Sequence, residues 1–320
     1  MSTPPAALGS SDMTQRIRIA SRTSIMATAQ VTWLMGEITR TRPDVTSEFV
    51  PITTTGDRWT GPLAEVGGKA VFTSAVTRAV LDGHADLALH CSKGMPGDAP
   101  EPDGMVCLYP RRDDVHDVLV HRHGHKLDDL PPGTRIGTSA PRRIAQLTAS
   151  HPHLVLVPVR GNADTRLALA QDGETVDAVI LARAGLRRIG REAEATETLD
   201  MHRLMPALGA GQLAMQAREA DQTTLAVLTP LTDAAATQAA TAERTLLRAL
   251  AGHCHAPIAG HATVDARGEV CLAARVYAPD GSIVLDSGRT GRVPEEVGAA
   301  VAEDLISRGA NAVLAASRRS

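Results

Sequence analysis

Residues 16–41 read RIRIASRTSIMATAQVTWLMGEITRT, a short alternating segment followed by a long run with apolar residues at helical spacing. This pattern predicts a strand over 16–20 and a helix over 24–41 that ends before Pro43. A strand over 48–53, a helix over 70–81 and a strand over 86–90 are expected next. The βαβαβ order that results is typical of a doubly wound α/β domain.

The alternation repeats after residue 115. Strands are expected over 117–120, 135–139, 154–159 and 177–181, with helices from Pro141 and over 163–170. A third unit begins near residue 235 with a helix to 250 and strands over 257–264, 269–277 and 282–286, where Asp280-Gly281 suits a hairpin turn. The sequence therefore predicts two doubly wound α/β domains and a smaller α+β domain, with ligands at strand carboxyl ends or between domains.

The composition excludes several classes of protein. Hydrophobic residues make up 43% of the 320-residue chain, as in globular proteins, and no apolar run approaches a membrane span. A net charge of −3 argues against a general nucleic-acid binder. Residues 1–15 are rich in Ser, Pro and Thr, which predicts a disordered extension and not a signal peptide. The four cysteines have no CxxC spacing, so reduced thiols and a cytoplasmic location are expected.

Basic residues gather where strands are expected to meet helices. Arg142 and Arg143 follow Gly137-Thr138-Ser139, and Arg160 and Arg166 flank the start of the next helix. Helix N-termini favour anions, and Arg binds carboxylates through two hydrogen bonds. A polyanionic ligand is the favoured interpretation, and a solvated basic face is the alternative. The chain has only three lysines, Lys69, Lys93 and Lys126, so those retained are candidates for specific roles.

Two histidine tracts are candidate reactive sites. His121, His123 and His125 would share one face of a strand, but no carboxylate or Cys lies near them in the sequence, which favours a solvated loop over a metal site. Cys254 lies between His253 and His255 in a loop, where its thiol is either activated or an inert packed group. No metal site is expected.

Nine ordered segments together resemble the hydroxymethylbilane synthase (porphobilinogen deaminase) family. They are RIASRTS at 18–24, TTTGD at 53–57, PLAEVGGKAVF at 62–72, HCSKG at 90–94, GTSAPRR at 137–143, RGNADTRL at 160–167, ILARAGLRRIG at 180–190, AER at 242–244 and GHCHAP at 252–257. The resemblance runs from residue 16 to the C-terminus.

The resemblance implies two periplasmic-binding-protein-like domains, formed by residues 16–112 with 212–229 and by residues 113–211. A third domain over 235–320 would carry a dipyrromethane cofactor on Cys254 through a thioether. The implied enzyme is a cytoplasmic, monomeric transferase of tetrapyrrole synthesis that deaminates porphobilinogen and joins it head to tail into a linear tetrapyrrole. Nucleic acid and membrane are not expected partners.

The resemblance also assigns roles to residues. Cofactor binding falls to Cys254, Ser24, Lys69, Ser139, Arg142, Arg143 and Arg160, and substrate binding falls to Arg22, Arg160, Arg166 and Arg188. Lys93 and Arg22 would be catalytic. The pyrroles carry acetate and propionate groups, so an arginine-rich site suits them.

The departures from the family pattern concern the expected active site. Gly94 stands where the family has an aspartate that bonds pyrrole N–H groups, and Asp98 on the following loop is a possible substitute acid. Cys91, His253 and Arg183 replace a serine, a glycine and a small apolar residue, and 209–212 read GAGQ where the family has GQGA. We therefore expect slow or altered chemistry.

Three hypotheses follow from the sequence. The first is a pyrrole-condensing transferase that makes the usual product slowly, or a shorter or altered oligopyrrole. The second is a non-catalytic binder of porphobilinogen or oligopyrroles. The third is a two-domain anion-binding module unrelated to pyrroles, which would carry no adduct on Cys254.

Overall fold

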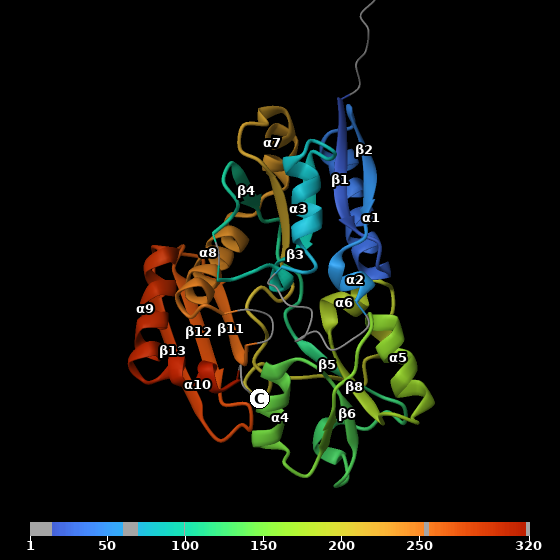
Figure 1. Ribbon diagram of the computed structural model, residues 1–320, viewed down its shortest axis with the longest axis vertical. Coiled ribbons are helices and arrows are strands. Elements are labelled where there is room, and N and C mark those ends of the chain that lie inside the picture. Colours follow the sequence, from blue (N-terminus) through green and yellow to red (C-terminus); the bar gives the residue numbers. More distant parts are fainter. Residues whose placement is uncertain (1–14, 60–69, 99, 253–255, 318–320) are drawn as a thin grey trace, which may run out of the picture.

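The chain folds around three β-sheets, each with its own helices. The computed structural model describes residues 15–59, 70–98, 100–252 and 256–317. Domain 1 lies at the top of Figure 1, domain 2 below it, and domain 3 beside both. This arrangement confirms the two α/β domains and the smaller α+β domain expected from the sequence.

Domain 1 is built from two separate parts of the chain. Its five-stranded sheet has the order β2-β1-β3-β10-β4, with β1, β2 and β3 parallel and β10 antiparallel to both neighbours. Its elements are β1 (Gln15–Arg22), α1 (Ile25–Thr41), β2 (Val45–Ile52), α2 (Thr55–Arg58), α3 (Ser74–Leu81), β3 (Leu87–Cys91), the short 3₁₀ helix η2 (Ser92–Gly94), β4 (Met105–Leu108), β10 (Leu213–Arg218) and α7 (Gln222–Leu228).

Helix α1 shows why this part of the sequence folds as it does. The hydroxyl oxygen of Ser24 accepts a hydrogen bond from the Ala27 amide at 3.3 Å and caps the helix. Val31, Leu34 and Ile38 recur at helical spacing and are buried against the sheet, together with Ile19 of β1. The cap leaves Ser24 and the preceding Arg22 at the carboxyl end of the sheet.

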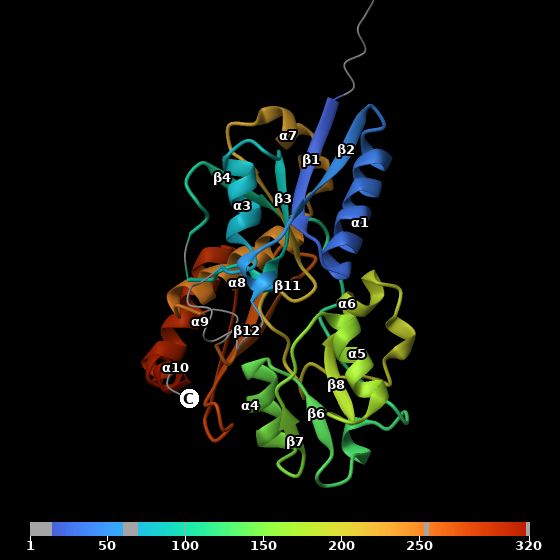
Figure 2. The ribbon, with the colours of Figure 1, turned by 45° about the vertical axis from the view of Figure 1, so that its right-hand side comes forward.

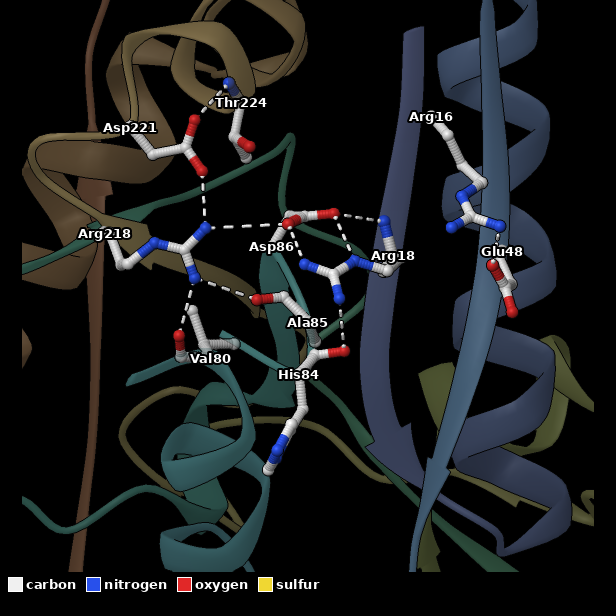
Figure 3. Close-up of polar contacts among 10 residues, drawn as sticks. All are labelled: Arg16, Arg18, Glu48, Val80, His84, Ala85, Asp86, Arg218, Asp221 and Thr224. Carbon is white, nitrogen blue, oxygen red and sulfur yellow. Dashed lines mark hydrogen bonds and ion pairs between the residues drawn. The ribbon is translucent and has the colours of Figure 1, made fainter. Parts of the chain in front are cut away.

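A group of ion pairs lies at the opposite end of this sheet (Figure 3). Asp86, just before β3, accepts hydrogen bonds from the Arg18 amide, Nε and Nη2 at 2.8, 3.1 and 2.7 Å. Arg218 of β10 lies 3.6 Å from the same carboxylate and bonds Asp221 at 2.7 Å. Burial opposes ionisation of Asp86, but the hydrogen bonds from Arg18 outweigh it, so its pKa is lowered. The network joins β1, β3 and β10.

Domain 2 comes from one continuous part of the chain. Its sheet has the order β7-β6-β8-β5-β9. Its elements are β5 (Asp117–His121), β6 (Arg135–Gly137), α4 (Pro141–Ser150), β7 (Val155–Val157), α5 (Ala163–Asp172), β8 (Ala178–Ala182), α6 (Arg183–Arg188) and β9 (Glu197–Thr198). Pro141 opens α4 and Asn162 caps α5, so both helices begin directly after the strands that precede them.

Domain 3 has the antiparallel sheet order β11-β12-β13. Its elements are α8 (Ala234–Ala249), β11 (Ile258–Val264), β12 (Val270–Tyr277), β13 (Val284–Gly291), α9 (Pro294–Ser307) and α10 (Ala310–Ser317). Leu246, Leu272, Val301 and Leu305 share one core between the helices and the sheet. Figure 2 shows α4 of domain 2 close to this sheet, and Ala145, Ala259 and Tyr277 form a small shared core there.

The three domains meet at Glu243 of α8. Two crossovers, residues 109–116 and 205–212, connect domains 1 and 2. Glu243 accepts hydrogen bonds from Arg112 in the first crossover at 2.7 and 3.2 Å, from the Gly209 amide in the second, and from the Ala262 amide of β11 at 2.8 Å. Burial opposes ionisation of Glu243, but Arg112 outweighs it and holds the pKa at about 2.

Glu243→Gln should destabilise the protein and make its free energy of unfolding less dependent on pH in the acidic range. It leaves the Arg112 charge uncompensated in a buried site, which costs about 3–5 kcal/mol. Because the folded pKa of Glu243 is about 2, below its ordinary 4.5, its contribution is complete above pH 4.5 and is lost as the pH falls towards 2. The difference between wild type and variant in urea unfolding should therefore shrink over that range. A difference that stays constant with pH would contradict this, and Glu37→Gln, on the exposed side of α1, is the control.

The element boundaries differ from the sequence prediction in a few places. The helix expected over 70–81 begins at Ser74, because Ala70 has a φ of +69° and forms a turn instead. The last expected strand, 282–286, extends over Val284–Gly291 in β13. Strands β4, β9 and β10 were not anticipated. In the described ranges, no helix has the length and apolar character needed to cross a membrane.

Candidate active site

Arg22 ends β1 and is held by a carboxylate. Its Nε donates to Asp57 Oδ1 at 3.1 Å, and its guanidinium lies 4.4 Å from the centre of the Phe72 ring. Asp57 also accepts hydrogen bonds from the amide and hydroxyl of Thr54, at 3.1 and 2.7 Å. The charge of Arg22 is therefore already balanced, which the sequence did not reveal.

Lys93 and Gly94 follow β3, the neighbouring strand, and lie in η2 on the side of domain 1 that faces domain 2. Part of the Lys93 side chain is exposed to solvent, but many protein atoms lie close around it. This surrounding protein displaces water and lowers the pKa of Lys93, and the cationic Arg143 and Arg142 add to the effect, while Cys91 opposes it. A Cβ built on Gly94 would meet no atom of the described residues within 4 Å. The backbone there can therefore accept a side chain.

Arg142 and Arg143 lie in the first turn of α4 and share one buried partner. Asp117, the first residue of β5, binds Arg142 at 2.7 Å and Arg143 at 3.0 and 2.7 Å. All three side chains are at most 8% exposed. Burial opposes ionisation of Asp117, but the two arginines outweigh it, and its pKa is strongly lowered. Asp117 neutralises one of the two positive charges, leaving a net charge of about +1.

Arg160 and Arg166 extend this positive region along the end of domain 2. Arg166 donates to the Gly161 carbonyl at 3.1 Å, and no carboxylate within the described residues pairs with either arginine. Burial, with the neighbouring charges of Arg143 and Arg160, lowers the pKa of Arg166 to about 10. Nη1 of Arg160 is buried without a hydrogen-bond partner in the described structure, while Nη2 lies 3.5 Å from the Trp59 carbonyl of domain 1. Among the described side chains, positive charge therefore exceeds negative charge at this junction.

Other residues assigned from the sequence have structural partners. The Ser139 hydroxyl donates to the Val159 carbonyl at 2.6 Å, and Ser24 caps α1. Arg188 lies 3.4 Å from Asp113 and donates to the Gly211 carbonyl at 3.0 Å, so it holds both crossovers. Arg183 pairs with Asp114 and Glu192 at 3.1 and 2.8 Å. Both arginines therefore have an acidic partner in the first crossover.

The loop after Gly94 brings domain 1 against domain 3. Asp98 is half-buried on this loop, whose neighbour Gly97 contacts Leu247 and the Gly252 carbonyl at the end of α8. Glu101 on the same loop is paired with Arg244 at 2.7 Å and cannot act as a free acid. Cys254 and Lys69, with His253 and His255, lie outside the described residues.

The histidine tract of domain 2 is in part the expected solvated loop at a strand end. His121 is a buried residue of β5 with its ring stacked on His125 at 4.8 Å, whereas His123 and His125 are exposed. Its pKa is lowered by burial and by the two neighbouring histidines. No group of three metal-ligating side chains arranged to hold an ion occurs in the part of the chain that is described.

Sequence reasoning missed the acids that hold the basic residues. Asp117 and Asp57 each bind arginines of the site, and the sequence does not indicate this role for either, although Asp57 ends the TTTGD motif. The only available signal was that Asp117 begins an otherwise apolar strand. A buried acid of this kind needs a cation, and two arginines were close by in the same expected domain.

Comparisons with known proteins agree on one family. Residues 17–226 match the family model described as "Porphobilinogen deaminase, dipyromethane cofactor binding domain", and residues 237–307 match "Porphobilinogen deaminase, C-terminal domain". The chain is 49% identical over 301 residues to "Porphobilinogen deaminase 2" of Streptomyces coelicolor, covering 93% of this chain and 96% of the relative.

A second relative and a solved structure were also found. "Porphobilinogen deaminase" of Bacillus subtilis is 38% identical over 300 residues, covering 93% of this chain and 95% of the relative. Among solved structures, the methionine-binding protein MetQ has 12% sequence identity and a TM-score of 0.42, and the alignment covers 68% of this chain and 89% of that chain.

Proposed function

The chain belongs to the porphobilinogen deaminase family, and from this we propose that it releases ammonia from porphobilinogen and joins the pyrroles head to tail into a linear tetrapyrrole. The observation that carries the proposal is the excess positive charge of Arg142, Arg143, Arg160 and Arg166 over Asp117, with a buried Arg160 nitrogen that has no described partner. A growing chain of pyrroles bears acetate and propionate groups and is therefore a polyanion. Guanidinium groups bind carboxylates in paired hydrogen bonds.

The residues present fit the dipyrromethane cofactor of this family. Its carboxylates suit the donor set of Arg142, Arg143 and Arg160, and Ser139 lies at the same strand end. We propose that Cys254 holds the cofactor through a thioether, with Lys69 and Ser24 as further donors. When bound, the cofactor supplies the pyrrole carbon to which new units are attached. The chain's own residues bind and orient the carboxylates.

Gly94 sets the expected rate of this reaction. Loss of ammonia leaves positive charge on the substrate pyrrole. The surrounding arginines are also positive and therefore disfavour this charge. A carboxylate aimed at the pyrrole N–H would compensate. Gly94 offers none, and Asp57 and Asp117 are already bound to arginines. We therefore propose slow turnover of porphobilinogen, with a shorter or altered oligopyrrole as another product of the same site.

The missing carboxylate also favours a second candidate, a paralogue that binds porphobilinogen or an oligopyrrole without turnover. The two are separated by incubating the purified protein with porphobilinogen and measuring ammonia release and linear tetrapyrrole together. Ammonia and tetrapyrrole support the first proposal. Saturable binding without ammonia supports the second.

Replacing Arg160 with leucine should weaken porphobilinogen binding by about 1.5–3 kcal/mol, the usual loss for a charge-assisted hydrogen bond. Calorimetric titration of both proteins measures the change. Arg160 is a cleaner test than Arg142, because removing Arg142 also deprives the buried Asp117 of a partner. Arg289→Leu on exposed β13 is the control, and equal affinity of wild type and Arg160→Leu would place Arg160 outside the site.

A further inference from the structure

Two successive residues of α8 hold two different parts of the molecule. Glu243 binds the crossovers, as described above. Arg244 reaches the loop of residues 95–102, which follows Gly94, and donates to Glu101 Oε1 at 2.7 Å and to the Pro96 carbonyl at 3.2 Å. The side chains of Arg244 and Glu101 are 11% and 22% exposed, so solvent screens this pair only in part.

The backbone of the same loop lies directly on the end of α8. A Cβ on Gly97 would come within 2.7 Å of Leu247 Cβ and 2.9 Å of the Gly252 carbonyl oxygen. Both values are below the closest approach of real Cβ atoms, so the approach requires glycine. Gly252 precedes Cys254 by two residues in the sequence. The loop that follows Gly94 therefore contacts residues that lie just before Cys254 in the sequence.

A buried polar chain continues from Glu101 back to β3, the strand that precedes Lys93 and Gly94. Gln216 Nε2 donates to Glu101 Oε2 at 2.6 Å, and the Thr77 hydroxyl donates to Gln216 Oε1 at 2.7 Å. His90 Nε2 lies 3.4 Å from the same hydroxyl, in a position to donate to it. Gln216, Thr77 and His90 are all buried, and His90 belongs to β3, which leads into η2. The chain therefore joins α8 of domain 3 to β3 of domain 1.

The loop is packed at its start, where Met95 is buried with Tyr109 and Ala236, but less closely near Glu101. A cavity of about 340 Å³ lies between the loop and α3, bounded by Thr77, Met95, Pro100, Glu101 and Arg244. Because side chains do not fill this open pocket, the hydrogen bonds of Glu101 help to fix the second half of the loop.

We propose that Glu101 and Arg244 are positioning residues that align the Lys93–Gly94 segment with the end of α8 that leads to Cys254. The inference rests on the proposed function, because Cys254 matters here as the residue that holds the growing pyrrole chain. Loosening the pair lets the reacting groups drift apart, while the arginines that bind carboxylates stay in place. The chemical step then slows, but binding of porphobilinogen does not change.

The test compares Glu101→Ala, Glu101→Gln and the control Asp304→Ala, which removes an acid whose two arginine partners, Arg289 and Arg308, lie in the same domain. We expect Glu101→Ala to lower kcat by about 10- to 100-fold, the scale of a small misplacement of reacting groups. KM should stay within about threefold and the cofactor should remain attached. Glu101→Gln keeps an acceptor for Arg244 and should recover part of kcat. Asp304→Ala should match wild type.

Hydrogen–deuterium exchange provides a measurement that does not depend on turnover. In Glu101→Ala, the peptides covering residues 95–102 and 246–252 should exchange faster together. Faster exchange in the loop alone would overturn the coupling, and unchanged kcat with faster exchange in both would overturn the positioning role. If wild type shows no turnover, the proposed function fails, and coupled exchange in the two peptides still decides whether Glu101 joins them. Where Glu101→Ala does not fold, Glu101→Gln is compared with wild type by the same criteria.

Discussion

Replacing Gly94 with aspartate should raise the rate of porphobilinogen consumption by about a hundred- to a thousand-fold, the usual worth of one preorganised group that stabilises charge in a transition state. The structure can accept the change, because a Cβ at this position meets no atom within 4 Å among the residues that the structure describes, and the backbone φ is not in the left-handed region. The new carboxylate would lie beside Lys93, in a region with excess positive charge. Initial rates of ammonia release from wild type and variant measure the effect.

Two further variants identify the cause of that gain. Gly94→Asn has nearly the same size without the charge, so it should stay close to the wild-type rate. Asp98→Asn tests whether the loop acid already supplies the function. A fast wild type that Asp98→Asn inactivates would mean that the loop has taken the role, and the Gly94→Asp gain would then be small. An unchanged rate in Gly94→Asp, with a different pyrrole product from wild type, would assign the site to other chemistry.

Replacing Cys254 with alanine should abolish turnover and remove the cofactor together. The thioether needs the cysteine sulfur, and without it the growing chain has no covalent attachment. The intact mass of wild type should exceed the polypeptide mass by two pyrrole units, and Cys254→Ala should show the polypeptide mass alone. Cys271→Ala is the matched control, because Cys271 is an exposed residue of β12.

The mass of the wild-type protein can also contradict the covalent attachment of the cofactor to Cys254. If wild type has only the mass of its polypeptide, no covalent cofactor is present, and His253 and His255 become the candidates for the reactive groups of that loop. A full cofactor mass in Cys254→Ala would move the attachment to one of the other three cysteines.

The fold could largely be predicted from the sequence because apolar spacing directly reflects local structure. The segments around residues 16–41 and 141–181 alternate between periods of two and nearly four, and β1, α1, α4, α5 and β8 form there within a few residues of expectation. Ala70 shows the limit of this reasoning. Nothing in its side chain indicates a positive φ, which arises from the turn that the surrounding structure imposes.

The site was harder to predict, because the ionic partners of its arginines come from distant residues. Arg142 and Arg143 were expected to bind a polyanionic ligand. Their carboxylate partner, Asp117, comes from β5, which lies two strands away from β6 in the order β6-β8-β5. Arg188 was expected to bind substrate, and its described partners are Asp113 and Gly211 in the crossovers. Sequence spacing identifies the type of group at each strand end. It does not identify the partner contributed by another strand.

The discontinuity of domain 1 also determines the order in which the molecule can form during synthesis. Strand β10 lies between β3 and β4. The edges of β3 and β4 that pair with it therefore stay uncovered until β10 has been made, roughly a hundred residues after β4. At about 5–20 residues per second this delay lasts on the order of 5–20 s. All five strands of domain 2 emerge within that interval, so domain 2 can complete its sheet while domain 1 still has two open edges. Unpaired edges are where strands of other chains add, which makes the nascent first domain the part of this protein most in need of a chaperone.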